Sequence, residues 1–170
     1  MDLSQFTIRQ LQPEADAAAY RAIRLEALRK SPTAFGSDLA GESAEPPEWF
    51  AERLKTSSVF GGFKGAALIG VAGLVVERQP KRAHKGSLWG VYVRPETRSA
   101  SVGRSLVKAV LAEAAGRVEI VHLTVERGNL NARRLYTSLG FVEFGLEKDA
   151  LKVDGTYYDN ILMALDLRPH

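Results

Sequence analysis

Residues 88–104 read LWGVYVRPETRSASVGR. The apolar, β-branched and aromatic residues at the start of this stretch predict a strand over residues 88–93. A polar turn follows, and the spacing of Val102 and Leu106 then predicts a helix over residues 102–115. The stretch therefore predicts a strand, a basic turn and a helix start in direct succession.

This layout is compatible with an anion site at the helix start. The first turn of a helix has unpaired backbone N–H groups and a partial positive charge, and small residues let a ligand approach them. With two flanking arginines, the turn predicts a phosphate or pyrophosphate site. A plain N-capped helix, with Ser101 as the cap, explains the same residues equally well. The residues expected at the site are Arg98, Ser99, Ala100, Ser101, Val102, Gly103 and Arg104.

A second informative segment, residues 129–141, reads NLNARRLYTSLGF. Its apolar spacing predicts a helix over residues 130–139, with Gly140 as the C-terminal cap. On this helix Tyr136 reads first as a core aromatic. A neutral phenol with a pKa near 10 is also able to give a proton to a leaving thiolate, so a catalytic role stays open.

The order of the remaining elements predicts an α/β (α+β mixed) domain with a central mixed sheet. A helix is expected from Pro13 to Ser31, a loop over residues 36–47 and a short helix over residues 47–55. Further strands are expected at residues 7–11, 59–64, 66–77, 120–125, 141–146 and 157–165. Asp154 and Gly155 predict the turn between the last two strands.

Composition excludes several classes of protein. The 170 residues suit one domain, and the absence of cysteine excludes disulfides, cysteine zinc sites and thiol nucleophiles. We expect a cytoplasmic protein, because the first residues lack a signal-peptide layout. The longest apolar stretch, residues 66–76, is too short to cross a membrane. A net charge of +3 does not predict nucleic-acid binding.

Charge is unevenly distributed. Residues 37–52 carry five acids and no Lys or Arg, whereas residues 78–85 carry four basic residues. Both runs read first as solvated surface. The alternative for the acidic run, Asp38–Glu48, is that it borders an acceptor site and favours cationic amines.

Taken together, the two motifs resemble the GCN5-related N-acetyltransferase (GNAT) superfamily. The first is Val93-x-Pro95-Glu96-x-Arg98-x-x-Ser101-x-Gly103-Arg104, and the second is Asn129-x-x-Ala132-x-x-Leu135-Tyr136-x-x-x-Gly140-Phe141. The resemblance implies a single GNAT domain over residues 1–170, with a mostly antiparallel mixed sheet of six to seven strands and about four helices. It also implies acetyl transfer from acetyl-CoA to an amine, without a metal.

The resemblance implies roles for individual residues. The backbone of Val91 and Val93 would hold the cofactor arm, the Val93 N–H would polarise the acetyl carbonyl, and Tyr136 would protonate the leaving thiolate. The turn from Arg98 to Arg104 would bind pyrophosphate, and the Asn129 side chain would hydrogen-bond the cofactor. The remaining positions expected to contact the cofactor are Tyr92, Asn131, Ala132 and Arg133.

Two positions depart from the family pattern. Ser101 stands where the family usually has Gly, which leaves the CoA affinity open. Thr124 stands where family members that acetylate ribosomal-protein N-termini carry a Glu that acts as the general base. Thr cannot serve as that base.

The general base is therefore not assigned by the motifs. The candidates are Glu77, His84 and Glu126, each of which reads first as a surface residue, and a water relay is also open. His122 reads as a core or surface histidine.

The sequence leaves the acceptor undefined beyond an amine. An inactive acyl-CoA-binding module on the same fold is the main alternative to an enzyme. The sequence also does not decide whether the protein forms a homodimer.

Overall fold

The structure is a computed structural model that describes residues 5–97 and 100–170. Its strands are β1 (Thr7–Gln10), β2 (Ser58–Lys64), β3 (Ala67–Val76), β4 (Lys85–Val93), β5 (Ile120–Glu126), β6 (Val142–Val153) and β7 (Thr156–Asp166). Its α-helices are α1 (Ala17–Lys30), α2 (Leu39–Ser43), α3 (Pro47–Thr56), α4 (Ala100–Ala115) and α5 (Leu130–Ser138). Short 3₁₀ turns are η1 (Pro32–Ala34) and η2 (Pro95–Thr97).

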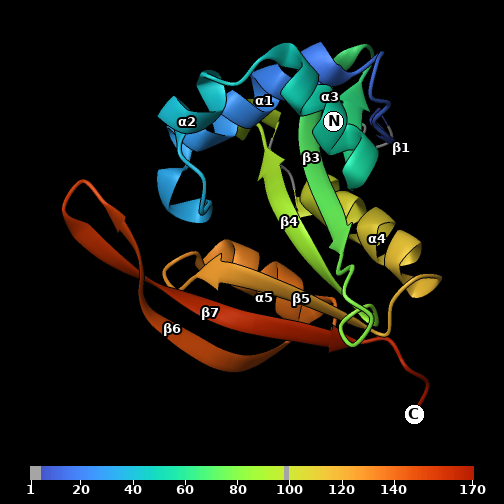
Figure 1. Ribbon diagram of the computed structural model, residues 1–170, viewed down its shortest axis with the longest axis vertical. Coiled ribbons are helices and arrows are strands. Elements are labelled where there is room, and N and C mark those ends of the chain that lie inside the picture. The colour runs from blue at the N-terminus through green and yellow to red at the C-terminus, as the bar shows by residue number, and fades with distance from the viewer. Residues whose placement is uncertain (1–4, 98–99) are drawn as a thin grey trace.

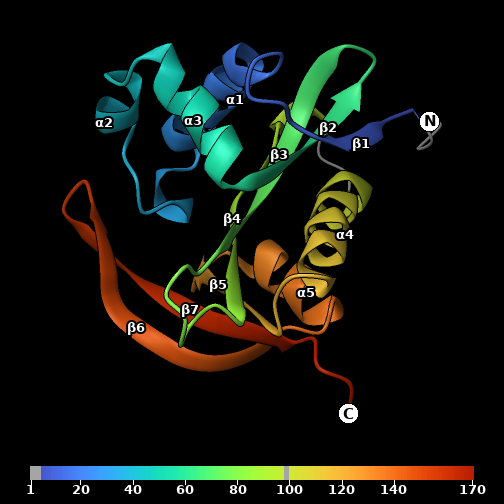
Figure 2. The same cartoon turned by 45° about the vertical axis from the view of Figure 1, so that its right-hand side comes forward.

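Within the described ranges the strands form one seven-stranded sheet in the order β1-β2-β3-β4-β5-β7-β6. Neighbouring strands are antiparallel except for β4 and β5, which are parallel. The prediction of a mixed, mostly antiparallel sheet is confirmed. Figures 1 and 2 show α1, α2 and α3 together at one end of the molecule and α5 beside β5 at the other.

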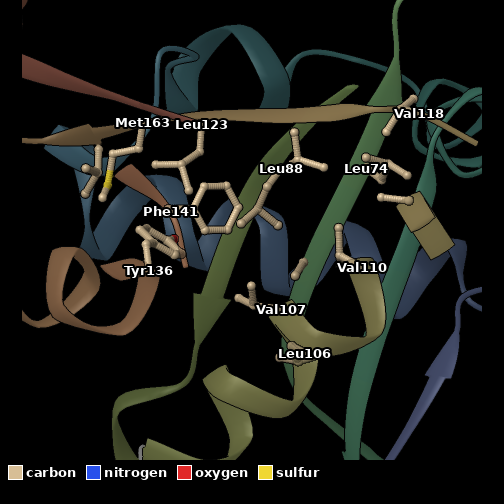
Figure 3. Packing of buried hydrophobic residues seen from close by; sticks show 14 of the residues in the cluster. Leu74, Leu88, Leu106, Val107, Val110, Val118, Leu123, Tyr136, Phe141 and Met163 are labelled. Carbon is tan, nitrogen blue, oxygen red and sulfur yellow. The ribbon is translucent and has the colours of Figure 1, made fainter. Parts of the chain in front are cut away.

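Two apolar clusters lie on opposite faces of the sheet. The first contains α4 residues such as Leu106 and Val110 together with Phe141 and Met163, and Figure 3 shows this packing. The second contains residues of α1 and α3, such as Ile23 and Phe50. The continuous apolar run of β3 contributes to both clusters, as expected for a strand covered on both faces.

The feature that positions the site is the divergence of β4 from β5. These two strands pair only between Lys85–Ser87 and Ile120–His122. Further along, β4 contains a bulge, because Trp89 and Tyr92 oppose β3 residues that are only two apart. Gly90 in the bulge has φ +64°, a conformation that costs other residues roughly 1–2 kcal/mol. Over residues 88–93 β4 therefore diverges from β5, and a gap opens between two adjacent strands.

Three predicted elements differ from the structure. The loop expected over residues 36–47 contains the short helix α2, and the first helix begins at Ala17 rather than at Pro13. The strand expected over residues 141–146 continues to Val153. Its second half is rich in charged residues, and it forms a strand because β7 pairs with it, across a bulge in which Asp149 has φ 52°.

No helix in residues 5–97 or 100–170 combines the length and the apolar character needed to cross a bilayer.

Candidate active site

A cavity of about 940 Å³ occupies the gap between β4 and β5. Its walls are residues 88–93 of β4 and residues 123–126 of β5. Lys30, the last residue of α1, and residues 31–35 form one end, and residues of α4 and α5 form the other. The helix α1 packs on one face of the sheet and α4 on the other, so helices from both faces contribute to the lining of the cavity.

The α4 end of the cavity fits a phosphate-bearing ligand. A Cβ placed on Gly103 would lie 3.7 Å from Leu135 and 3.8 Å from Val93, both of which line the cavity, so the missing side chain leaves space there. Arg104 also lines the cavity, and its Nη1 donates to Ser138 Oγ at 2.8 Å. Arg98 and Ser99 lie outside the described residues, and of Ala100 only the backbone is described.

Ser101 and Val102, the next two residues of the predicted anion site, differ in their surroundings. The Val102 side chain is buried in the core, so only its backbone is available to a ligand. Ser101 belongs to the first turn of α4 but does not line the cavity.

The three predicted residues of β4, Val91, Tyr92 and Val93, all line the cavity. The side chain of Tyr92 is buried and its hydroxyl donates to Glu26 Oε2 at 2.8 Å, so Tyr92 offers its backbone to a ligand. This part of β4 has diverged from β5 and lines the cavity.

At the start of α5, Asn129 acts as the N-cap. Its Oδ1 accepts a hydrogen bond from the Ala132 N–H at 3.3 Å, which leaves the side-chain amide group as the donor toward the cavity. Asn129, Asn131 and Ala132 line the cavity as predicted.

Arg133, which was predicted to contact the cofactor, does not line the cavity, whereas the adjacent Arg134 does. Arg133 turns away, with Nη2 2.8 Å from Glu143 Oε1 and Nη1 2.8 Å from the Arg127 carbonyl. Arg134, one position on, lines the cavity. Consecutive helical residues point about 100° apart, so a neighbouring position in sequence faces another side.

Tyr136 combines a buried ring with access to the cavity. It is 7% exposed and lines the cavity. Its ring packs edge-on against the ring of Phe141, with 5.9 Å between the two ring centres (Figure 3). Burial raises the pKa of its phenol to about 12. The core-aromatic and catalytic interpretations are therefore compatible: the ring packs in the core, and the phenol is neutral at physiological pH.

The candidate bases do not lie together. Glu126 lines the cavity, on the same face of β5 as Thr124, which lies two residues earlier. Glu77 and His84 flank the loop at the opposite end of β4, where Glu77 pairs with Arg82 at 3.3 Å and the His84 carbonyl accepts from Glu119. Neither lines this cavity, so the choice of Glu77 and His84 as base does not fit the geometry.

His122 is half-buried, with its ring 5.4 Å from that of Phe144. Burial, followed by the charge of Lys85, lowers its pKa. It does not line the cavity.

The acidic run is not a uniform solvated surface. Glu42 is 5% exposed, and its carboxylate accepts from Arg24 Nε and Nη2, each at 2.9 Å, with Arg53 Nη1 at 3.4 Å. Burial alone would raise the Glu42 pKa, but the two guanidinium groups outweigh it and hold that pKa below its ordinary value. The negative charge of Glu42 is therefore neutralised inside the fold rather than presented to an acceptor.

An aromatic wall at the α1 end was not anticipated from the sequence. Phe35 and Trp89 line the cavity, and the Arg24 guanidinium lies 5.1 Å and 5.6 Å from their ring centres. Lys30 lines the same end. In the sequence, the only sign of this wall is a Trp next to a Gly in a strand, since residues 30–35 otherwise read as a helix end and a turn.

A family model places these features in a known group. The model described as "Acetyltransferase (GNAT) family" matches residues 23–141, which include both sequence motifs and the whole of β4 and β5. The chain belongs to this acetyltransferase family. The resemblance inferred from the two motifs is thereby confirmed, and acetyl-CoA, the predicted cofactor, is the acyl donor of the family. Among the described residues of this GNAT chain, no group of three or more His, Asp and Glu side chains is arranged to hold a metal.

Relatives agree with this family. The GNAT chain is 31% identical over 147 residues to a mycothiol acetyltransferase of Thermobispora bispora, covering 82% of this chain and 48% of that protein. It is 31% identical over 149 residues to a mycothiol acetyltransferase of Frankia casuarinae, covering 81% and 42%. The chain thus spans about half the length of these relatives.

Solved structures share the fold. A GNAT acetyltransferase of Streptococcus pneumoniae has a TM-score of 0.83 at 21% identity, covering 94% of this chain and 98% of that one. A putative acetyltransferase from Salmonella typhimurium, solved with its cofactor acetyl-CoA, has a TM-score of 0.80 at 24% identity, covering 98% and 96%. The predicted GNAT fold is therefore confirmed.

Proposed function

We propose that this chain, acting as one domain over residues 1–170, is an N-acetyltransferase that moves the acetyl group of acetyl-CoA onto a primary amine. One observation carries the proposal: a cavity lined by β4 and β5 has residues 30–35 at one end and residues of α4 and α5 at the other. In such a cavity a phosphate-bearing donor at the α4 end and an amine at the α1 end would meet at the edge of β4.

Several residues would hold the cofactor. Arg104 and Arg134 would pair with its phosphates, and Gly103 would let them approach the start of α4. Residues 91–93 of β4, which line the cavity, would bind the amide-containing arm of the cofactor. Acetyl-CoA supplies an activated thioester, whose C–S bond breaks as the C–N bond to the amine forms.

Glu126 is the base in this proposal, because among Glu77, His84 and Glu126 only Glu126 lines the cavity. An ammonium must lose a proton before its nitrogen attacks a carbonyl, and the Glu126 carboxylate would accept that proton. Thr124, on the same face of β5, has no group able to do this.

Tyr136 would stabilise the departing sulfur mainly by donating a hydrogen bond. Its pKa of about 12 lies above the ordinary thiol value of about 8.5, so complete proton transfer to the thiolate is uphill by roughly 5 kcal/mol. A hydrogen bond to the developing negative charge does not carry that cost. This refines the proton-donor role that the family resemblance implies.

The test is to incubate purified protein with acetyl-CoA and a panel of amines, and to measure free thiol together with the acetylated product. Acceptors related to mycothiol belong in the panel because of the names of the relatives. CoA should also raise the melting temperature, since it binds the folded state. CoA binding without acetylation of any amine would favour the alternative, an inactive acyl-CoA-binding module. Cytoplasmic location, a homodimer and independence from nucleic acid remain predictions.

A further inference from the structure

The charges at the α1 end of the cavity indicate what kind of amine it accepts; this inference rests on the proposed function. Four charged side chains line the cavity in the described residues: Lys30, Arg104, Glu126 and Arg134. Arg104 and Arg134 belong to the α4 and α5 side. The other two, Lys30 at the end of α1 and Glu126 at the end of β5, carry opposite charges.

A partly buried positive charge lies beside this end of the cavity. Arg24 and Arg53 share the single carboxylate of Glu42, which leaves the trio with a net charge of +1. The Arg24 and Arg53 guanidinium groups lie 5.6 Å and 4.8 Å from the centre of the Trp89 ring. Salt screens buried and partly buried charges much less than surface charges. The positive charge of the trio therefore attracts anions on the cavity side of the Trp89 ring.

Other charges beside this wall cancel. Arg94 Nε lies 3.6 Å from Glu26 Oε1, and the same carboxylate accepts from Tyr92, so this pair adds no net charge. Among the residues that line the cavity outside α4 and α5, the charge is therefore positive at Lys30 and negative at Glu126. This is opposite to the expectation of a cationic acceptor, since a second ammonium would meet Lys30.

We propose that the acceptor is a small amine that carries a carboxylate close to the amine, as α-amino acids do. The carboxylate binds Lys30 in the field of the Arg24–Arg53–Glu42 trio, and the amine lies at Glu126. The side chain of the acceptor packs on the rings of Phe35 and Trp89. Lys30 is thus a specificity residue, whereas Glu126 belongs to the transfer step.

The first arm of the test compares three acceptors with the same side chain: phenylalanine, phenylalaninamide and phenethylamine. We expect kcat/KM for phenylalanine to exceed that for the other two by about tenfold or more, the effect of one charge-assisted hydrogen bond. The amide has the less basic amine, so a larger fraction of it is neutral at pH 7.5. Chemistry alone therefore favours the amide, and a preference for it or for phenethylamine overturns the inference.

The second arm uses a matched pair of variants. Arg29 and Lys30 are adjacent, exposed, basic residues in the last turn of α1, but only Lys30 lines the cavity. Lys30→Gln should raise KM for phenylalanine about tenfold and leave KM for phenylalaninamide and the affinity for CoA unchanged. Arg29→Gln should change neither KM, and Lys30→Arg should largely restore the preference. An equal effect of Lys30→Gln on both acceptors would contradict a carboxylate contact.

Calorimetry on the protein–CoA complex separates the two proposals. If no acceptor releases thiol, the proposed function fails. Phenylalanine should still bind the complex more tightly than phenylalaninamide, and this difference should disappear in Lys30→Gln. Equal binding of the two in the wild-type protein would overturn the acceptor inference whatever the activity.

Discussion

Arg24 of α1 and Glu42 of α2 form a bidentate, buried ion pair, with Nε to Oε1 and Nη2 to Oε2 both at 2.9 Å. Each residue is 5% exposed. The pair ties the segment that carries α2 to the helix that carries Lys30, and Arg24 also contacts the rings of Phe35 and Trp89. One ion pair therefore supports the cavity wall and the position of α2.

Glu42→Gln should destabilise the protein by about 3–5 kcal/mol, because it leaves two arginines around an uncharged side chain in a buried site. Glu48→Gln is the matched control: Glu48 is exposed and belongs to the same acidic run, and its substitution should change the stability by less than about 0.5 kcal/mol. Chemical denaturation measures both. Equal small effects would show that the Glu42 carboxylate contributes no more than a surface charge.

The same carboxylate predicts a pH dependence of stability. The folded-state pKa of Glu42 lies below its ordinary value of 4.5, so its contribution is complete above that value and is lost as pH falls through the folded-state pKa. Unfolding free energies of the wild-type protein and of Glu42→Gln should therefore differ most above pH 4.5 and converge at lower pH. A difference that is constant from pH 7 down to pH 3 would contradict this.

Adjacent arginines on α5 allow a sharp test of the cofactor site. Arg134→Ala should weaken CoA binding by about tenfold or more, the usual effect of losing a charge-assisted hydrogen bond to phosphate. Arg133→Ala should leave CoA affinity unchanged and cost only its surface pair with Glu143 and its hydrogen bond to the Arg127 carbonyl, together at most about 2 kcal/mol. Calorimetric titration with CoA compares them. The reverse order of effects would restore the sequence-based choice of Arg133.

Tyr136→Phe should lower kcat about tenfold while CoA affinity and stability persist, because only a hydrogen bond to the leaving sulfur is lost. The packing of the ring on Phe141 is retained by the mutant. Tyr157→Phe, on an exposed hairpin residue away from the cavity, is the control. Unchanged turnover with chemistry rate-limiting would show that the sulfur is stabilised by another group, such as water.

Local sequence signals were sufficient for most of the fold. The turn glycines, the apolar run of β3 and the helical spacing of residues 102–115 and 130–139 are short-range patterns, and all correspond to observed elements. The second half of β6 could not be predicted in the same way. Its charged residues resemble a loop, and its strand conformation depends on pairing with β7.

The sequence alone determined the family and the position of Tyr136 on its helix, because these depend on a strand, a turn and helix starts whose residues are contiguous. Only the tertiary structure decided that Arg134 rather than Arg133 faces the cavity, that Glu126 rather than Glu77 or His84 lines it, and that Glu42 is neutralised by Arg24. Each of these outcomes depends on the divergence of β4 from β5 and on the packing of α1 and α2 beside it. The side of the cavity on which a charge lies is set by contacts between residues far apart in the chain.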